Sequence, residues 1–188
     1  VHLDDHGLPI HGVLAASPDW AVVEAAADDQ GAWLRTCLEH DGRSPRFAAF
    51  PFAHRLEVEV ALTGRALRVA TTLTPTGPHD VPVAFGWHPY LAPPEAPRAD
   101  WVMAPATTAR AVLDARSLPT GEIVEDPSLP GPLGSRTLDE LLAEVADCAQ
   151  AEVVAAGRRL VVRYVEGYRW AVVFAPASPD VVCLEAMT

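Results

Sequence analysis

The chain has 188 residues, of which 49% are hydrophobic and 21% are charged, proportions that are ordinary for one globular domain with a sizeable core. Its formal net charge of -11 argues against a nucleic-acid partner, because such affinity depends on clustered cations that displace counterions from phosphates. No lysine occurs, so neither a Schiff base with a carbonyl substrate nor a lysine-anchored pyridoxal phosphate can form.

The apolar runs and the cysteines of the chain indicate where the protein is found and whether it forms disulfides. No apolar run approaches the ~20 residues of a membrane-spanning helix, and no basic-then-apolar leader opens the chain, so we expect a cytoplasmic protein without membrane contact. Three widely spaced cysteines, Cys37, Cys148 and Cys183, match neither a disulfide framework nor a Cys-x-x-Cys site. We interpret all three as small buried hydrophobic residues.

Strands are predicted through the first half of the chain, beginning with Trp20–Ala27 and Ala32–Glu39. The clearest strand is His54–Thr63, where apolar and polar residues alternate with the period of two expected when one sheet face is buried. The alternation resumes over Ala66–Thr74 after a turn centred on Gly64. These two segments therefore predict an antiparallel hairpin.

The second half predicts further strands and one helix. The strands are Ala151–Ala156, Leu160–Val165, Trp170–Phe174 and Val181–Glu185, with Gly157-Arg158 closing another hairpin. A helix is predicted over Thr137–Ala146, because its three leucines and Val145 share one face at helical spacing and Thr137 can cap it. One short helix among eight or more strands predicts an all-β sandwich or barrel, in a single domain spanning residues 1–188.

An imidazole stands between large aromatic residues in the segment Phe85-Gly86-Trp87-His88-Pro89-Tyr90. The proline fixes the backbone immediately after His88, so the ring is held in place. Two interpretations are open, a packed histidine at the end of a strand or a group that transfers protons. Trp87 and Tyr90 are candidates to stack against a ligand.

Glu185 ends an otherwise apolar strand. Its side chain shares a face with Val181 and Cys183, while Val182 and Leu184 take the other face. The carboxylate either lies in solvent just past the sheet edge or is partly desolvated, which would raise its pKa toward the range of a general base. The sequence favours neither alternative.

Two weaker candidates are His11 and Asp139. His11, within Pro9-Ile10-His11-Gly12, is either a second imidazole in a cleft or an exposed residue near the chain end. Asp139 favours the N-terminus of the predicted helix electrostatically, and a role in substrate binding stays open. His2, His6 and His11 have a loose metal-like spacing, but the closing ligands of a structural zinc site are lacking, so no metal site is predicted.

Four segments, taken in order, resemble the aldose 1-epimerase family. They are Leu8-Pro9-Ile10-His11-Gly12, then Thr74-Pro75-Thr76-Gly77 continued by Gly86-Trp87-His88-Pro89-Tyr90, then Leu118-Pro119-Thr120-Gly121, and finally Cys183-Leu184-Glu185-Ala186-Met187-Thr188. The resemblance spans nearly the whole chain and implies a galactose mutarotase-like supersandwich, a large antiparallel β-sandwich whose concave face binds a free hexose. Family members usually have strands before the first segment, so we expect a sandwich that lacks N-terminal strands.

The resemblance also implies an activity and residue roles. The expected protein is an isomerase, an aldose 1-epimerase or mutarotase, that interconverts α and β anomers of a free aldohexose without a cofactor. His88 would be the general acid toward the ring oxygen and Glu185 the general base toward the anomeric hydroxyl. His11 and Asp139 would bind the sugar, and Trp87 and Tyr90 would supply stacking surfaces.

Two other functions remain open from the sequence. One is a non-catalytic carbohydrate-binding sandwich, favoured by Leu14-Ala15 and Ala186, which depart from the family pattern. The other is a hexose-6-phosphate 1-epimerase. The retained histidine and glutamate favour an enzyme, because a binding module needs neither an acid nor a base. An open sheet edge predicts a homodimer, since unpaired strand edges pair readily.

Overall fold

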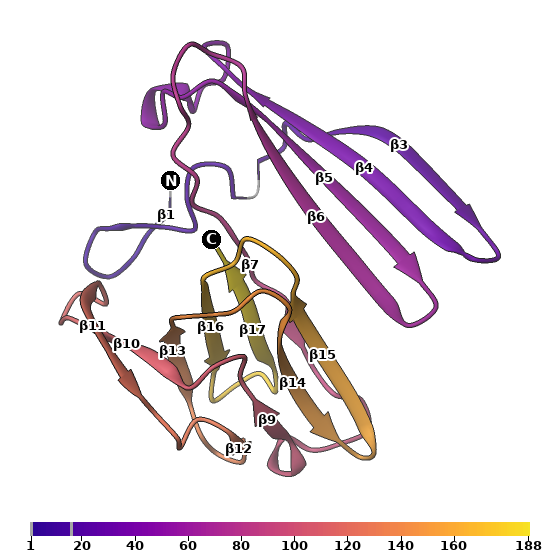
Figure 1. The fold of residues 1–188 in the computed structure, drawn as a ribbon, viewed down its shortest axis with the longest axis vertical. Coiled ribbons are helices and arrows are strands. Elements are labelled where there is room, and N and C mark those ends of the chain that lie inside the picture. Colours follow the sequence, from indigo (N-terminus) through magenta and orange to yellow (C-terminus); the bar gives the residue numbers. More distant parts are fainter. Residues whose placement is uncertain (1, 16) are drawn as a thin grey trace. The chain divides into compact units, whose positions relative to one another are not determined.

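Strands dominate the computed structural model, which describes residues 2–15 and 17–188 (Figure 1). Within these ranges the helices are two 3-10 turns, η1 (Phe47–Ala49) and η2 (Arg98–Asp100), and no helix is long and apolar enough to cross a membrane. The predicted all-β class is therefore confirmed. The chain divides into two compact units, residues 1–83 and 84–188, so the single domain stays a prediction.

The first unit is built on a four-stranded antiparallel sheet in the order β3-β4-β5-β6. Its strands are β3 (Ala21–Asp28), β4 (Gly31–His40), β5 (His54–Thr63) and β6 (Ala66–Pro75), and the short strands β1 (His2–Leu3) and β2 (Pro9–Ile10) pair separately. β5 and β6 pair without interruption from His54↔Pro75 to Thr63↔Ala66, which confirms the predicted hairpin. Gly64 supplies the positive φ, 57°, that the tight turn requires.

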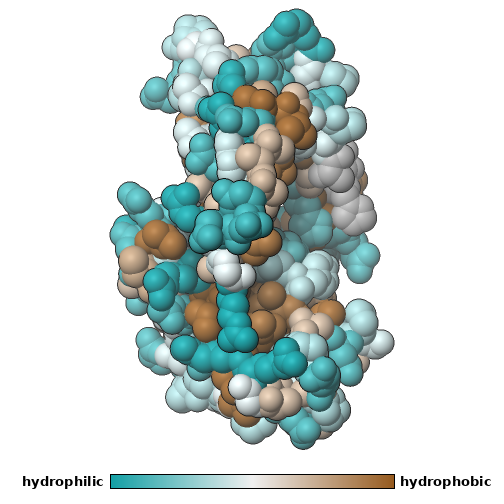
Figure 2. Space-filling view, turned by 90° about the vertical axis from the view of Figure 1, so that its right-hand side faces the viewer, coloured by the Kyte–Doolittle hydropathy of each residue, from teal (hydrophilic) through white to brown (hydrophobic). Residues whose placement is uncertain are grey.

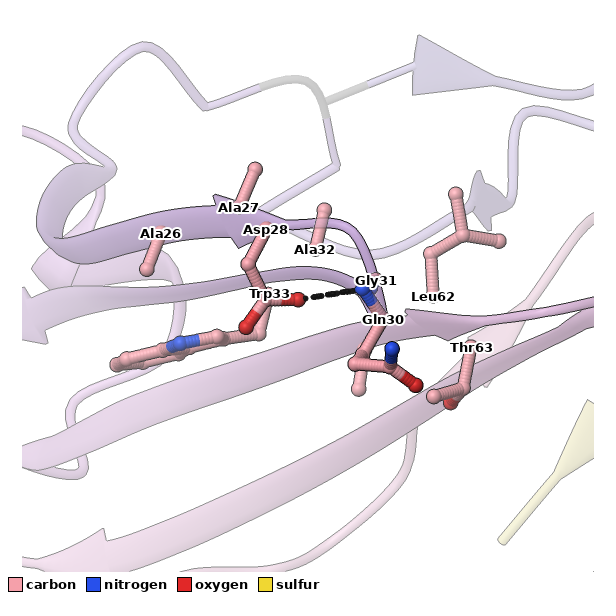
Figure 3. A pocket seen from close by; sticks show the side chains of 10 residues that line it. Ala26, Ala27, Asp28, Gln30, Gly31, Ala32, Trp33, Leu62 and Thr63 are labelled. Atoms are coloured by element: carbon pink, nitrogen blue, oxygen red, sulfur yellow. Dashed lines mark hydrogen bonds between the residues drawn. The ribbon is translucent and has the colours of Figure 1, made fainter.

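The turn between β3 and β4 surrounds a shallow hollow of the first unit (Figure 3). The Asp28 carboxylate accepts the backbone N–H groups of Gln30 and Gly31, at 2.7 and 3.1 Å. Gly31 is required by the close approach of the neighbouring strand, because a Cβ there would lie 2.2 Å from the Leu62 carbonyl oxygen. The hollow is otherwise lined mostly by apolar side chains. Its one carboxylate, that of Asp28, accepts the hydrogen bonds of the turn.

The second unit contains two antiparallel sheets that form a sandwich. The seven-stranded sheet has the order β11-β10-β13-β16-β17-β7, with β8 also pairing with β17; its strands are β7 (Gly86–Trp87), β8 (Tyr90–Leu91), β10 (Ala109–Leu113), β11 (Pro119–Glu125), β13 (Leu138–Leu142), β16 (Trp170–Ala175) and β17 (Val182–Met187). The four-stranded sheet has the order β12-β9-β14-β15, made of β12 (Gly131–Pro132), β9 (Val102–Ala104), β14 (Ala149–Ala155) and β15 (Arg158–Tyr164).

The core of the second unit lies between these two sheets. β17 contributes Val182 and Leu184, and β14 contributes Val153, all with no exposed surface, to one cluster of buried residues. Trp101 and Tyr164 are its largest members. Burying each large apolar side chain stabilises the fold by about 1.5–3 kcal/mol, so this cluster fixes which face of β17 points inward.

The predicted helix over Thr137–Ala146 is wrong, because Leu138–Leu142 forms the strand β13. This strand pairs with β16 from Leu138↔Ala175 to Leu142↔Ala171 and with β10 at Arg110↔Leu142. Leucines four residues apart share a face in a helix and also in a strand, so the pattern alone was ambiguous. Pairing with two neighbouring strands decided the outcome. The other predicted strands agree with the structure to within two residues at each end.

Several large hydrophobic side chains remain exposed in the first unit. Val22 on β3 and Leu67 on β6 are 66% and 65% exposed, and both strands are edges of their sheet. The space-filling view shows hydrophobic patches among the hydrophilic side chains that cover most of the visible face (Figure 2). All eight residues of β3 are exposed and six of them are apolar, so this edge offers a largely apolar strand to a partner.

We expect the chain to self-associate through β3, because the unpaired backbone groups of an edge strand can pair with a second copy. Val22→Lys should shift the protein toward the monomer in sedimentation velocity, since a charge on an edge strand opposes pairing. Leu67→Lys is the matched control on the opposite edge and should leave the association unchanged. A wild-type chain that sediments as a single monomeric species would contradict the expectation.

Candidate active site

The two segments that carry the principal candidate residues meet at strand β17. Glu185 lies on β17, and His88 lies between β7 and β8, which both pair with β17 through Ala186↔Trp87 and Cys183↔Tyr90. His88 Nε2 lies 3.1 Å from Glu185 Oε1. Two residues separated by nearly a hundred positions in the chain are thus in direct contact.

The backbone around β7 is pinned to the end of the chain. The Phe85 N–H donates to Thr188 Oγ1 at 3.0 Å, and the Thr188 N–H donates to the Phe85 carbonyl at 3.0 Å. Gly86 allows close approach, because a Cβ there would lie 2.9 Å from the Ala186 carbonyl oxygen and 2.9 Å from Met187 Cγ. The segment that leads into His88 is therefore held against β17 by its backbone.

Aromatic rings orient the His88 imidazole. The ring stacks on Tyr90, with centroids 4.6 Å apart and an interplanar angle of 20°, and meets Phe174 of β16 edge-on at 6.0 Å. The His88 side chain keeps 32% of its surface exposed, against 12% for Glu185. Contacts with Tyr90 and Phe174 therefore hold the His88 ring in place, and a ligand can reach the pair through the exposed part of His88.

Burial raises the pKa of the Glu185 carboxyl to about 7, and the negative charge of Asp139 adds to the rise. A cationic His88 would oppose this rise through its attraction for the carboxylate. Of the two alternatives that the sequence left open, the structure supports partial desolvation. A carboxylate poised near neutrality can accept a proton from a substrate hydroxyl and return it.

Asp139 lies on the same sheet face as Glu185. It pairs with Phe174, which pairs with Cys183, and residues directly opposite in an antiparallel sheet project to the same side. Cys183 is two positions from Glu185 along β17 and shares its face. Asp139 is exposed, so its carboxylate is available to a ligand on this face.

Tyr90 and Trp87 lie on opposite faces of the sheet. Tyr90 pairs with Cys183 on the Glu185 face and is 62% exposed, as a stacking surface requires. Trp87 pairs with Ala186, a core residue, and 37% of its surface is exposed. The register therefore places Trp87 away from the Glu185 face, and its predicted contact with sugar stays a prediction.

His11 belongs to the first unit, where its φ of 64° places it in the left-handed region. Its predicted role as a sugar ligand stays a prediction.

Sequence reasoning placed Cys183 on the same strand face as Glu185 but gave it no role at the site. It missed Phe174, which lies beside His88 because β16 pairs with β17. Cys183 is fully buried, and burial together with the Glu185 charge raises the pKa of its thiol to about 11. The expectation that all three cysteines are buried holds for Cys183. It is wrong for Cys37, which is half-buried, and for Cys148, which is exposed.

The chain belongs to the aldose 1-epimerase family, whose model matches residues 2–188. Among curated proteins, no sequence matches the chain significantly.

Several solved structures are similar to this chain. A galactose mutarotase-like protein from Clostridium acetobutylicum has a TM-score of 0.85 at 16% identity, over 95% of this chain and 58% of that one. A Synechocystis protein has a TM-score of 0.75 at 26% identity, over 98% and 58%. A galactose mutarotase related enzyme from Lactobacillus acidophilus has a TM-score of 0.74 at 16% identity, over 99% and 62%. The chain therefore spans about three-fifths of the length of these relatives.

Gly86→Ala should destabilise the protein by about 1–3 kcal/mol, because the added methyl group clashes with the backbone of β17 and forces the strands apart. Urea unfolding measures this change. Gly42→Ala is the control, since its Cβ would meet no atom within 4 Å, and it should change stability by about 0.5 kcal/mol or less. Equal unfolding midpoints for the two variants would show that β7 is not held as tightly as described.

Proposed function

We propose that this chain is a mutarotase that interconverts the α and β anomers of a neutral aldohexose, with His88 as general acid and Glu185 as general base. The observation that carries the proposal is the 3.1 Å contact between His88 Nε2 and the desolvated Glu185 carboxylate on one sheet face. The ring oxygen and the anomeric hydroxyl of a hexose are both bonded to C1. An acid and a base that serve them must therefore lie side by side.

In the proposed reaction, Glu185 removes the proton of the anomeric hydroxyl while His88 protonates the ring oxygen. The bond between C1 and the ring oxygen breaks, and the electron pair of the O1–H bond becomes the carbonyl bond of the open aldehyde. Rotation about the C1–C2 bond presents the other face of the aldehyde. Closure then runs in reverse, with both protons returned and no net consumption of any reactant.

Three further residues are proposed to bind the sugar. Tyr90 offers a flat apolar surface beside His88, and such surfaces pack against the C–H faces of a sugar ring. Asp139 offers an exposed carboxylate that accepts hydrogen bonds from sugar hydroxyl groups. We also propose that His11 donates to the substrate, as the family resemblance implies.

His88→Ala and Glu185→Gln should each slow catalysed mutarotation by about 10²–10⁴-fold, because each removes one positioned proton-transfer group. The measurement is the optical rotation of freshly dissolved α-D-glucose and α-D-galactose, compared with the uncatalysed rate. Urea unfolding midpoints near that of the wild type would show that the loss is chemical. If the folded wild type binds the sugars calorimetrically but does not accelerate mutarotation, the non-catalytic binding alternative is correct.

We expect the chain to prefer neutral aldohexoses to hexose 6-phosphates, because Asp139 and Glu185 place two carboxylates on the substrate face and repel a phosphate dianion. Glucose should show a kcat/KM at least about tenfold above that of glucose 6-phosphate, equivalent to ~1.4 kcal/mol. Asp139→Asn should lower the ratio of kcat/KM for glucose to kcat/KM for glucose 6-phosphate, because it removes one negative charge from the substrate face. A higher kcat/KM for glucose 6-phosphate would favour the phosphosugar alternative.

A further inference from the structure

Three side chains with metal-binding atoms converge at the site. One ligand atom each from His88, Cys183 and Glu185 lies within 4.8 Å of the other two. The mutarotase mechanism uses the imidazole and the carboxylate and gives the thiol no role. Cys183 is therefore a fully buried, chemically capable group next to the proposed acid and base, without an assigned function.

The dimensions of this triangle suit Zn²⁺. Tetrahedral zinc has bonds of about 2.0–2.1 Å to nitrogen and oxygen and about 2.3 Å to sulfur, so its ligand atoms lie roughly 3.2–3.7 Å apart. His88 Nε2 and Glu185 Oε1, at 3.1 Å, lie about 0.1 Å below that range. The widest pair in the triangle has to close by at most about 1 Å, which side-chain rotation can supply.

The fold places the donors without help from a metal. Cys183 and Glu185 are alternate residues of β17 and project to the same side of the sheet. His88 lies between β7, which pairs with Ala186 of β17, and β8, which pairs with Cys183, and Tyr90 stacks on the His88 ring. Three ligands from two adjacent chain segments are thus preorganised.

The ligand types select the metal. A thiolate, an imidazole and a carboxylate together suit a borderline ion such as Zn²⁺ better than Mg²⁺ or Ca²⁺, which prefer oxygen ligands. Three protein ligands leave a fourth position for water, as in zinc sites that are open to small molecules. The exposed part of the His88 side chain gives the ion a path into the site.

We propose that His88, Cys183 and Glu185 form a three-ligand site for Zn²⁺, and that the bound ion blocks the proton-transfer pair. The Zn–S bond forms as the Cys183 thiol releases its proton to solvent, and the imidazole and carboxylate lone pairs fill two further positions. Both groups are then unable to exchange protons with a sugar. Metal binding itself does not depend on the proposed mutarotase activity, whereas the inhibitory effect rests on it.

The fold of the second unit does not depend on an ion bound at this site. The core of the second unit is complete without a metal, because its buried cluster joins both sheets. We therefore expect a reversible site whose removal leaves the fold intact.

Binding is tested with the full 188-residue chain after treatment with a chelator. Calorimetric titration with ZnCl₂ should show one ion per chain, and titration with CoCl₂ should produce a thiolate-to-cobalt charge-transfer band. Cys183→Ala should abolish the band and weaken Zn²⁺ binding by at least about tenfold. Cys148→Ala is the matched control, because that exposed cysteine lies outside the triangle, and it should behave as the wild type.

The inhibitory effect is tested in the mutarotation assay. Cys183→Ala should keep the activity of the wild type without metal and should no longer be inhibited by ZnCl₂. A charge-transfer band that persists in Cys183→Ala, or unchanged Zn²⁺ affinity in that variant, would overturn the metal site. A band that appears in the wild type and disappears in Cys183→Ala would support the metal site even if the chain showed no mutarotase activity. The experiments therefore distinguish a failure of the metal site from a failure of the proposed mutarotase function.

Discussion

The alternation of side chains along β17 is the constraint on which the site depends. Val182, Leu184 and Ala186 point into the core between the two sheets, and their burial fixes the orientation of the strand. Cys183 and Glu185 are then forced onto the opposite face. A register slip of one residue would bury the carboxylate in an apolar core, so the hydrophobic effect that stabilises the fold also determines where the proposed base lies.

The electrostatics of the site follow from that placement. Glu185 keeps only a small part of its side chain exposed, so the charged form loses hydration and its pKa rises to about 7. Asp139, which a neighbouring strand brings to the same face, opposes ionisation further. His88 is the group that can compensate the carboxylate charge, because β7 and β8 hold it in contact with Glu185. The contact between the proposed acid and the proposed base arises from ordinary sheet pairing.

Most of the candidate site residues lie in the second unit. The described candidate residues His88, Asp139 and Glu185 all belong to the second unit, whose two sheets enclose their own core. The first unit contributes a sheet with an exposed edge strand, together with His11. Because the chain spans 58–62% of the length of the solved relatives, its activity is a proposal that measurement on this chain has to establish.

The sequence by itself determined the all-β class, the β5–β6 hairpin and the identity of the acid and base candidates. Period-two alternation and turn glycines are local signals, so they can be recognised without knowing what packs where. The strand β13 could not be determined, because leucines four residues apart fit a helix and a strand equally well, and only hydrogen bonds from β10 and β16 decide between them. The contact of His88 with Glu185, the exclusion of Trp87 from that face and the convergence of Cys183 were decided by tertiary structure, because cross-strand register joins residues far apart in the chain.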